Sequence, residues 1–150
     1  MAKLTLQLVT PEKTVLNKEL DSLSCPTTLG QITILPHHIP LVATLAPGEL
    51  IAKSSGKEHI IAVAGGFVEV RDKGEVIILA DAAEHHYEID SKQAEEAVAR
   101  AKQDIAKMSA ASEEYAKVSA VLEKNLSRLN IARKHAHRKS SFVDKSTLEQ

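Results

Sequence analysis

Aromatic residues, cysteine and long apolar stretches are all scarce in this chain of 150 residues. Phe, Tyr and Trp make up 3% of it and Trp is absent, so the core must be aliphatic and platforms for stacking nucleic-acid bases are missing. The single cysteine, Cys25, allows no internal disulfide and no cysteine-cluster zinc site, and it fits a reducing compartment. No apolar stretch reaches the roughly 18 residues of a membrane-spanning helix. We also expect no signal peptide, because the first residues lack a basic segment followed by an apolar one.

The net charge is also small. The chain carries 19 Lys+Arg against 20 Asp+Glu, a formal charge of −1, whereas nucleic-acid binders are usually strongly basic. Hydrophobic residues make up 43% and charged residues 26%, which is ordinary for a globular protein. We therefore expect a folded chain that does not bind nucleic acid.

The composition changes sharply near residue 88. All six glycines and all five prolines precede that residue, and the remainder is rich in Ala, Glu, Lys and Leu. Turn-forming residues thus give way to helix-forming ones. We predict a β domain over residues 1–88, a helical hairpin over residues 89–139 and a loose tail over residues 140–150.

Alternating apolar residues predict strands in the first unit, beginning with Leu4, Leu6 and Leu8. Further strands are expected around Lys13–Leu16, Leu20–Cys25, Thr33–Leu35, Pro40–Leu45, Leu50–Ser54, His59–Ala64, Phe67–Arg71 and Val76–Ala80. Short strands at this spacing are typical of a sandwich or barrel. Gly65–Gly66 is expected to be a tight passage between two strands, and Asp72–Gly74 the turn of a hairpin.

Two amphipathic helices are predicted in the second unit, with Asp90 and Ser112 as their N-caps. The first apolar stripe comprises Ala94, Val98 (or Ala97), Ala101, Ile105 and Met108, and the second comprises Tyr115, Val118, Leu122, Leu126 and Leu129. The stripes are narrow and rich in alanine, so a hairpin formed by them buries little apolar area and is held weakly.

No set of residues forms a catalytic pattern. The histidines at 37–38, 85–86 and 135/137 lack cysteine partners and an HExxH spacing, so we expect exposed loop histidines and no metal site. Gly65–Gly66 lacks the Lys-Ser/Thr pair of a phosphate loop, and Cys25 lacks a catalytic histidine pattern. These observations favour an interaction or regulatory subunit over an enzyme.

Several segments resemble the epsilon subunit of bacterial F-type ATP synthases. They are Leu4–Pro11, Gly30–Leu41, Ala46–Gly48, Val63–Val70 and Val76–Asp81. The resemblance implies a β-sandwich of about ten strands followed by an antiparallel two-helix hairpin. It also implies a non-catalytic rotor subunit of a proton- or sodium-translocating ATP synthase, peripheral on the cytoplasmic face of the inner (plasma) membrane. Its partners would be the gamma subunit, the c-ring and the alpha and beta catalytic subunits, and its hairpin would inhibit ATP hydrolysis.

The resemblance also implies three sets of site residues. Contacts with gamma and the c-ring are expected at Gly30, Gln31, Ile32, His37 and His38. Inhibitory contacts are expected from the basic residues Arg128, Arg133, Lys134, Arg138 and Lys139. A nucleotide site would comprise Ile89, Asp90 and Ala94, with Arg100 and Arg128 as further cations.

Two departures from the family pattern qualify these expectations. Pro36-His37-His38 stands where the family often has Pro-Gly-His, which predicts that this loop avoids positive φ here. Gln93 replaces the arginine of the ATP motif, so we expect weak ATP binding and no other cofactor. The alternatives to the rotor subunit are a small ATP-binding sensor and an interaction adaptor unrelated to energy coupling.

Overall fold

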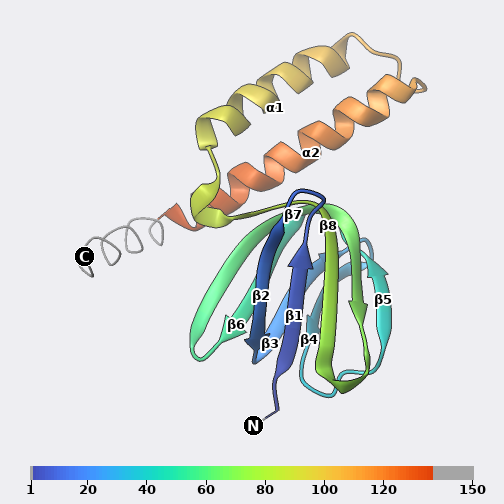
Figure 1. The fold of residues 1–150 in the computed structure, drawn as a ribbon. Helices are drawn as coiled ribbons and strands as arrows, with labels where there is room; N and C mark the ends of the chain where they lie inside the picture. Colours follow the sequence, from blue (N-terminus) through green and yellow to red (C-terminus); the bar gives the residue numbers. More distant parts are fainter. Residues whose placement is uncertain (1, 137–150) are drawn as a thin grey trace. The chain divides into compact units, whose positions relative to one another are not determined.

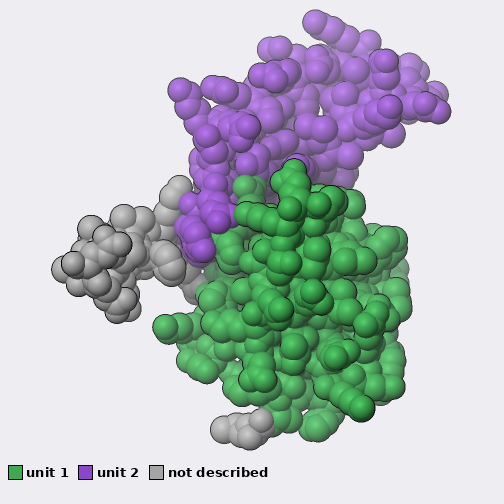
Figure 2. All heavy atoms as spheres, in the orientation of Figure 1, with its two compact units in different colours: residues 1–85 green, residues 86–150 purple. Residues whose placement is uncertain are grey.

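The computed structural model describes residues 2–136 and separates the chain into two compact units, residues 1–85 and 86–150 (Figure 2). The 3-10 turn η2 (His86–Glu88) therefore goes with the helices. The predicted tail at 140–150, together with Arg138 and Lys139, lies outside the described residues.

Eight strands make up the first unit (Figure 1). They are β1 (Leu4–Val9), β2 (Thr14–Leu20), β3 (Ser22–Thr27), β4 (Gly30–Ile34), β5 (Leu41–Thr44), β6 (Gly48–Ser54), β7 (Lys57–Val70) and β8 (Glu75–His85). The order in the sheet is β2-β1-β8-β7-β6-β3-β4, and β5 pairs with β7. All the ladders are antiparallel except that between β1 and β8.

Strand β7 belongs to both layers of the sandwich. Its first half, Lys57–Val63, pairs with β6, whereas Phe67–Val70 pairs with β5 on the same edge. The chain bends between these halves at Gly65 and Gly66, whose φ values are 69° and 109°. A Cβ on Gly66 would lie 2.0 Å from the backbone oxygen of Leu79, so only glycine fits there.

The continuous β7 corrects two expectations. His59–Ala64 and Phe67–Arg71 belong to one strand with a bend, and Gly65–Gly66 lies within that strand. The described residues contain eight strands, where about ten were expected. The merging of two predicted segments accounts for one strand of this difference, because paired glycines bend a strand while its ladder to β8 resumes in the same register.

Aliphatic side chains fill the sandwich, as the scarcity of aromatics requires. Leu4, Leu6 and Leu8 are fully buried and alternate with exposed residues along β1. Cys25 is also fully buried, and burial raises the pKa of its thiol to about 11. A thiol in this environment is not a nucleophile at neutral pH.

The second unit is an antiparallel hairpin of α1 (Ser91–Ala106) and α2 (Glu113–Lys134) (Figure 1). Both predicted N-caps are confirmed, because Asp90 accepts from the backbone N–H of Gln93 at 3.0 Å and Ser112 from that of Tyr115 at 3.1 Å. The core between the helices is small and comprises Ala94, Val98, Leu122 and Leu129.

One position of the predicted second stripe is wrong. Leu126 is 38% exposed, and Asn125 is buried beside it with 6% exposure. The Asn125 amide donates to the backbone oxygen of Val121 at 2.8 Å, which satisfies the buried polar group within its own helix. Leu122 and Leu129 are two helical turns apart, so residues 125 and 126 lie on either side of the line between them.

Candidate docking surfaces

Three apolar side chains stand exposed on one face of the sandwich. Val42 on β5, Phe67 on β7 and Leu79 on β8 are 70%, 56% and 56% exposed. Phe67 and Leu79 are direct cross-strand partners, and Val42 pairs with Glu69, two residues from Phe67. Since alternate residues of a strand share a face, all three point to the same side. We call Val42, Phe67 and Leu79 the apolar sheet face.

The residues between them point into the core. Val68 and Ile78 are fully buried and pair with each other across the ladder. Strands β7 and β8 are therefore apolar on both faces at these positions. Exposing the outer apolar face to water is unfavourable, whereas exposing a polar face costs little. A contiguous exposed apolar patch on a sheet is typical of a protein-interaction surface.

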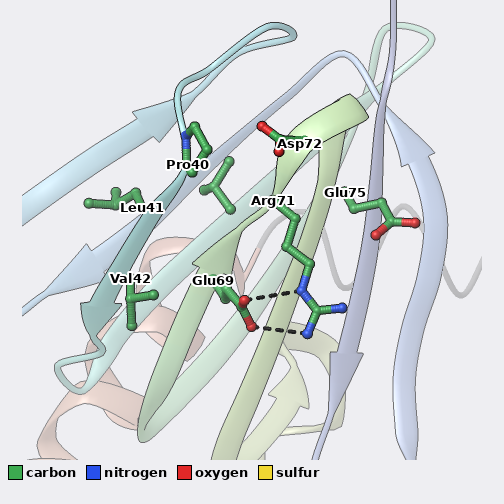
Figure 3. A pocket seen from close by; sticks show the side chains of 8 residues that line it. Pro40, Leu41, Val42, Glu69, Arg71, Asp72 and Glu75 are labelled. Carbon is green, nitrogen blue, oxygen red and sulfur yellow. Dashed lines mark hydrogen bonds and ion pairs between the residues drawn. The ribbon is translucent and has the colours of Figure 1, made fainter.

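A shallow groove of about 580 Å³ borders this face and is lined by Pro40, Leu41, Val42, Glu69, Val70, Arg71, Asp72 and Glu75. Figure 3 shows the Arg71 guanidinium joined to the Glu69 carboxylate by two hydrogen bonds, of 3.1 and 3.2 Å. This hydrogen bonding raises the pKa of Arg71. The groove thus places a fixed ion pair beside apolar contacts, as the polar rim of an interface does.

The loop after β4 forms a second surface at one end of the sandwich. Leu35 and Ile39 are 55% and 75% exposed there, and a hollow of about 430 Å³ separates the loop from the Asp72–Gly74 turn. His37 adopts φ = 69°, so the prediction that this loop avoids positive φ is wrong. A hydrogen bond of 3.1 Å from the His38 N–H to the Leu35 oxygen closes the turn, and histidine enters this region more readily than most residues.

The five predicted gamma and c-ring contact residues do not form one cluster. Gly30 and Gln31 begin β4, whereas His37 and His38 follow its other end. Gly30 and Ile34 are four residue steps apart along an extended strand, about 13 Å. Ile32 is half-buried and packs against the sandwich core, so its side chain serves the fold.

The predicted nucleotide residues are only partly brought together. Asp90 is engaged as the N-cap of α1, and Ile89 is 1% exposed. Ala94 shares a cluster with Leu129, which places the neighbouring Arg128 at the same level of the hairpin. Arg100 lies ten residues beyond Asp90, about 15 Å along the helix. It lines a groove between the helices to which Ile89, Asp90 and Ala94 do not contribute.

The three predicted inhibitory residues that the structure describes already have partners. Arg128 donates to the Asn125 side-chain oxygen at 2.8 Å, and Arg133 lies 3.6 Å from the Glu95 carboxylate. Lys134 has a partner as well. Because Arg133 and Glu95 are 68% and 57% exposed, that ion pair stabilises the hairpin little.

Within residues 2–136, no three His, Cys, Asp or Glu side chains are placed to share a metal ion. Neither helix of that region combines the length and apolarity needed to cross a membrane.

Comparison with known proteins identifies the family. Residues 3–86 match the family described as ATP synthase, Delta/Epsilon chain, beta-sandwich domain. The ATP synthase epsilon chain of Dehalococcoides mccartyi is 42% identical over 89% of this chain and 95% of its own length. That of Nitratidesulfovibrio vulgaris is 38% identical over 85% and 94%. A chain in the cryo-EM structure of the Euglena gracilis mitochondrial ATP synthase OSCP/F1/c-ring superposes with a TM-score of 0.73 at 25% identity, covering 85% of this chain and 79% of that one. This chain belongs to the epsilon chain family of ATP synthases.

Proposed function

We propose that this chain is a non-catalytic rotor subunit of an F-type ATP synthase, and that it couples the catalytic head to the ion-translocating ring. The observation that carries the proposal is the match to epsilon chains over nearly their whole length, across both units. The chain would work in the assembled complex, peripheral on the cytoplasmic face of the inner membrane.

The apolar sheet face would bind the gamma subunit. Its three side chains lie adjacent on paired strands, which suits a central patch that excludes water when a partner covers it. The loop surface, with Leu35, His37, His38 and Ile39, would contact the c-ring. Two separate surfaces allow one domain to hold two partners at the same time.

The helical hairpin would act as a brake on ATP hydrolysis. Its core comprises few residues, so separating the two helices exposes little apolar area. Residues 91–134 in one continuous helix would span about 66 Å, enough to reach far into a neighbouring assembly. Basic residues of α2 would then meet acidic surface on the alpha and beta subunits, in contacts that salt weakens.

Two experiments test this proposal. Co-purification of tagged chain with gamma should yield a stable complex, and residues 1–88 alone should remain folded and still bind gamma. Deleting residues 89–150 in the reconstituted enzyme should raise ATP hydrolysis and leave synthesis largely intact. Unchanged hydrolysis would remove the inhibitory role, and failure to bind gamma would remove the rotor role.

ATP sensing by the hairpin is a second candidate function. Ile89, Asp90 and Ala94 match the family motif, and Arg128 lies on the partner helix at the level of Ala94. Two features argue against strong ATP binding. Asp90 already accepts a hydrogen bond as the N-cap of α1, and Gln93 supplies no guanidinium. Calorimetric titration of the full chain with ATP should therefore give a millimolar dissociation constant or no heat. Micromolar binding would favour the sensor.

A further inference from the structure

Lysine interrupts the apolar lining of the sandwich at edge strand β2. Leu4 pairs with Leu20, Leu6 with Lys18 and Leu8 with Leu16 across the β1–β2 ladder. Directly opposed residues point to the same side, and Leu6 is fully buried, so Lys18 occupies a core-facing position. Its exposed side chain therefore lies at the open border between the two layers of the sandwich.

Two histidines occupy core-facing positions on the opposite layer. His59 pairs with buried Ala52 and precedes Ile61 by two residues, so it shares the inner side of β7. His85 pairs with Ile61 itself. Lys57 continues the same row of β7 beyond His59. The inward rows of β7 and β8 thus change from aliphatic to basic residues, and Lys18 interrupts the aliphatic inward row of β2 between Leu16 and Leu20.

The groups meet across the layers. The Lys18 Nζ lies 3.2 Å from the His59 Nε2, which joins β2 to β7, two strands that do not pair. Burial is the largest cause of the lowered pKa of His59, and the positive charges of Lys18, His85 and Lys57 lower it further. On β6, Ser54 pairs with Lys57, and its hydroxyl donates to the Glu19 backbone oxygen.

Nearby carboxylates are directed elsewhere. Asp21 binds Lys3 and accepts from the Ser55 N–H at 2.9 Å. Glu58 pairs with Lys53 at 3.6 Å. Glu19 adjoins Lys18 and Glu84 adjoins His85, and strand alternation turns both carboxylates toward the other face of their strands.

We propose that Lys18, His59 and His85 form an oxyanion site that takes a phosphate group, free or at the end of a nucleotide. A phosphate has several acceptor oxygens and so can accept separate hydrogen bonds from donors on both layers at once. Protonation converts the His59 Nε2 from the acceptor of the Lys18 hydrogen bond into a second donor to the same anion. The anion would neutralise the repulsion among these cations.

The competing explanation is that Lys18 only guards an exposed sheet edge against aggregation. Inward-pointing charges on edge strands commonly serve that purpose. Edge protection requires a lysine alone, however, and does not require histidines at matching depth on β7 and β8. The two explanations differ in whether a phosphate group changes the titration of His59.

The test is imidazole NMR of the full chain, titrated with sodium phosphate and, separately, with sodium chloride at equal ionic strength. Phosphate should shift the His59 resonances saturably and raise the pKa of His59, and chloride should not. Lys18→Gln should weaken phosphate binding about tenfold or more, Lys18→Arg should retain it, and Lys13→Gln, a matched change of an exposed lysine, should have no effect. Equal effects of the two salts, or no saturable shift in the unmodified chain, would overturn the site.

A third titration with ATP distinguishes the source of the phosphate group. If the site takes a nucleotide, ATP shifts His59 at lower concentration than phosphate does, and Lys18→Gln abolishes that shift. Asp90→Ala, which alters the hairpin motif, should leave the His59 response unchanged. An ATP response of His59 that depends on Asp90 and not on Lys18 would contradict binding at the sandwich border.

Discussion

Replacing Phe67 by Ala should weaken binding to the gamma subunit and leave the β domain folded. Phe67 is 56% exposed on the apolar sheet face. A phenylalanine side chain presents roughly 200 Å², so about 110 Å² of it is free for a partner to cover. At about 25 cal/mol per Å² this area is worth about 2.8 kcal/mol, of which the alanine methyl retains a part. We expect a loss of about 2 kcal/mol, about 30-fold in the dissociation constant.

The effect on folding should be much smaller than the effect on binding. More than half of the Phe67 surface faces solvent in the free chain, and the neighbouring Val68 faces the core. Surface changes of this kind alter stability by about 0.5 kcal/mol or less. A change in affinity without a change in melting temperature would therefore separate a docking residue from a structural one.

The assay is calorimetry or interferometry with purified gamma, paired with thermal unfolding of each variant. Leu79→Ala, its cross-strand neighbour, should act in the same direction. Val121→Ala is the matched control, because Val121 is 47% exposed and belongs to the hairpin. If the Phe67 and Leu79 variants both bind gamma with unchanged affinity, gamma does not dock on this face.

Three further predictions concern other parts of the chain. His37→Gly should raise the melting temperature by a few degrees. Glycine adopts the positive φ of residue 37 without the strain of about 1–2 kcal/mol that histidine bears there, and this gain outweighs the added conformational freedom of the unfolded chain. A lower melting temperature would contradict this. Gln93→Arg should tighten ATP binding about tenfold in calorimetry, whereas Gln103→Arg on the same helix should not; equal gains would indicate general charge attraction. The pKa of His59 is lowered in the folded chain. Its contribution to stability is therefore fully present above the ordinary histidine pKa of about 6.5 and is lost as the pH falls through the folded value, because the unfolded chain binds the proton first. His59→Gln should flatten this part of the pH–stability curve measured by denaturant unfolding; an unchanged curve would assign the dependence to other groups.

Local signals in the sequence predicted the helices well. Asp90 and Ser112 lie directly before helix-forming stretches, and a cap depends only on residues within one turn. The strand count and the course of β7 depend instead on its pairing with β5, which is separated from β7 in the sequence by the whole of β6. Two adjacent glycines look the same in a turn and in a bent strand, so the sequence alone did not distinguish them.

The proposed docking surfaces leave a weaker signal in the sequence. Val42, Phe67 and Leu79 had a detectable signal, because their strands are apolar at consecutive positions instead of alternating ones. That signal shows two apolar faces but not which face remains exposed. The meeting of Lys18 with His59 had no local signal, because it depends on how two sheets face each other.

The state of Cys25 has a practical consequence for observing rotation. With a pKa of about 11, roughly one molecule in several thousand carries a thiolate at pH 7.5, and the sulfur is also shielded from solvent. Maleimide dyes and thiol-reactive spin labels should therefore not react with Cys25 in the folded chain. A cysteine introduced at Ser109, in the exposed connection between α1 and α2, would then be labelled selectively without first removing Cys25. Fluorescence from that position would report whether the hairpin opens while the assembled enzyme turns.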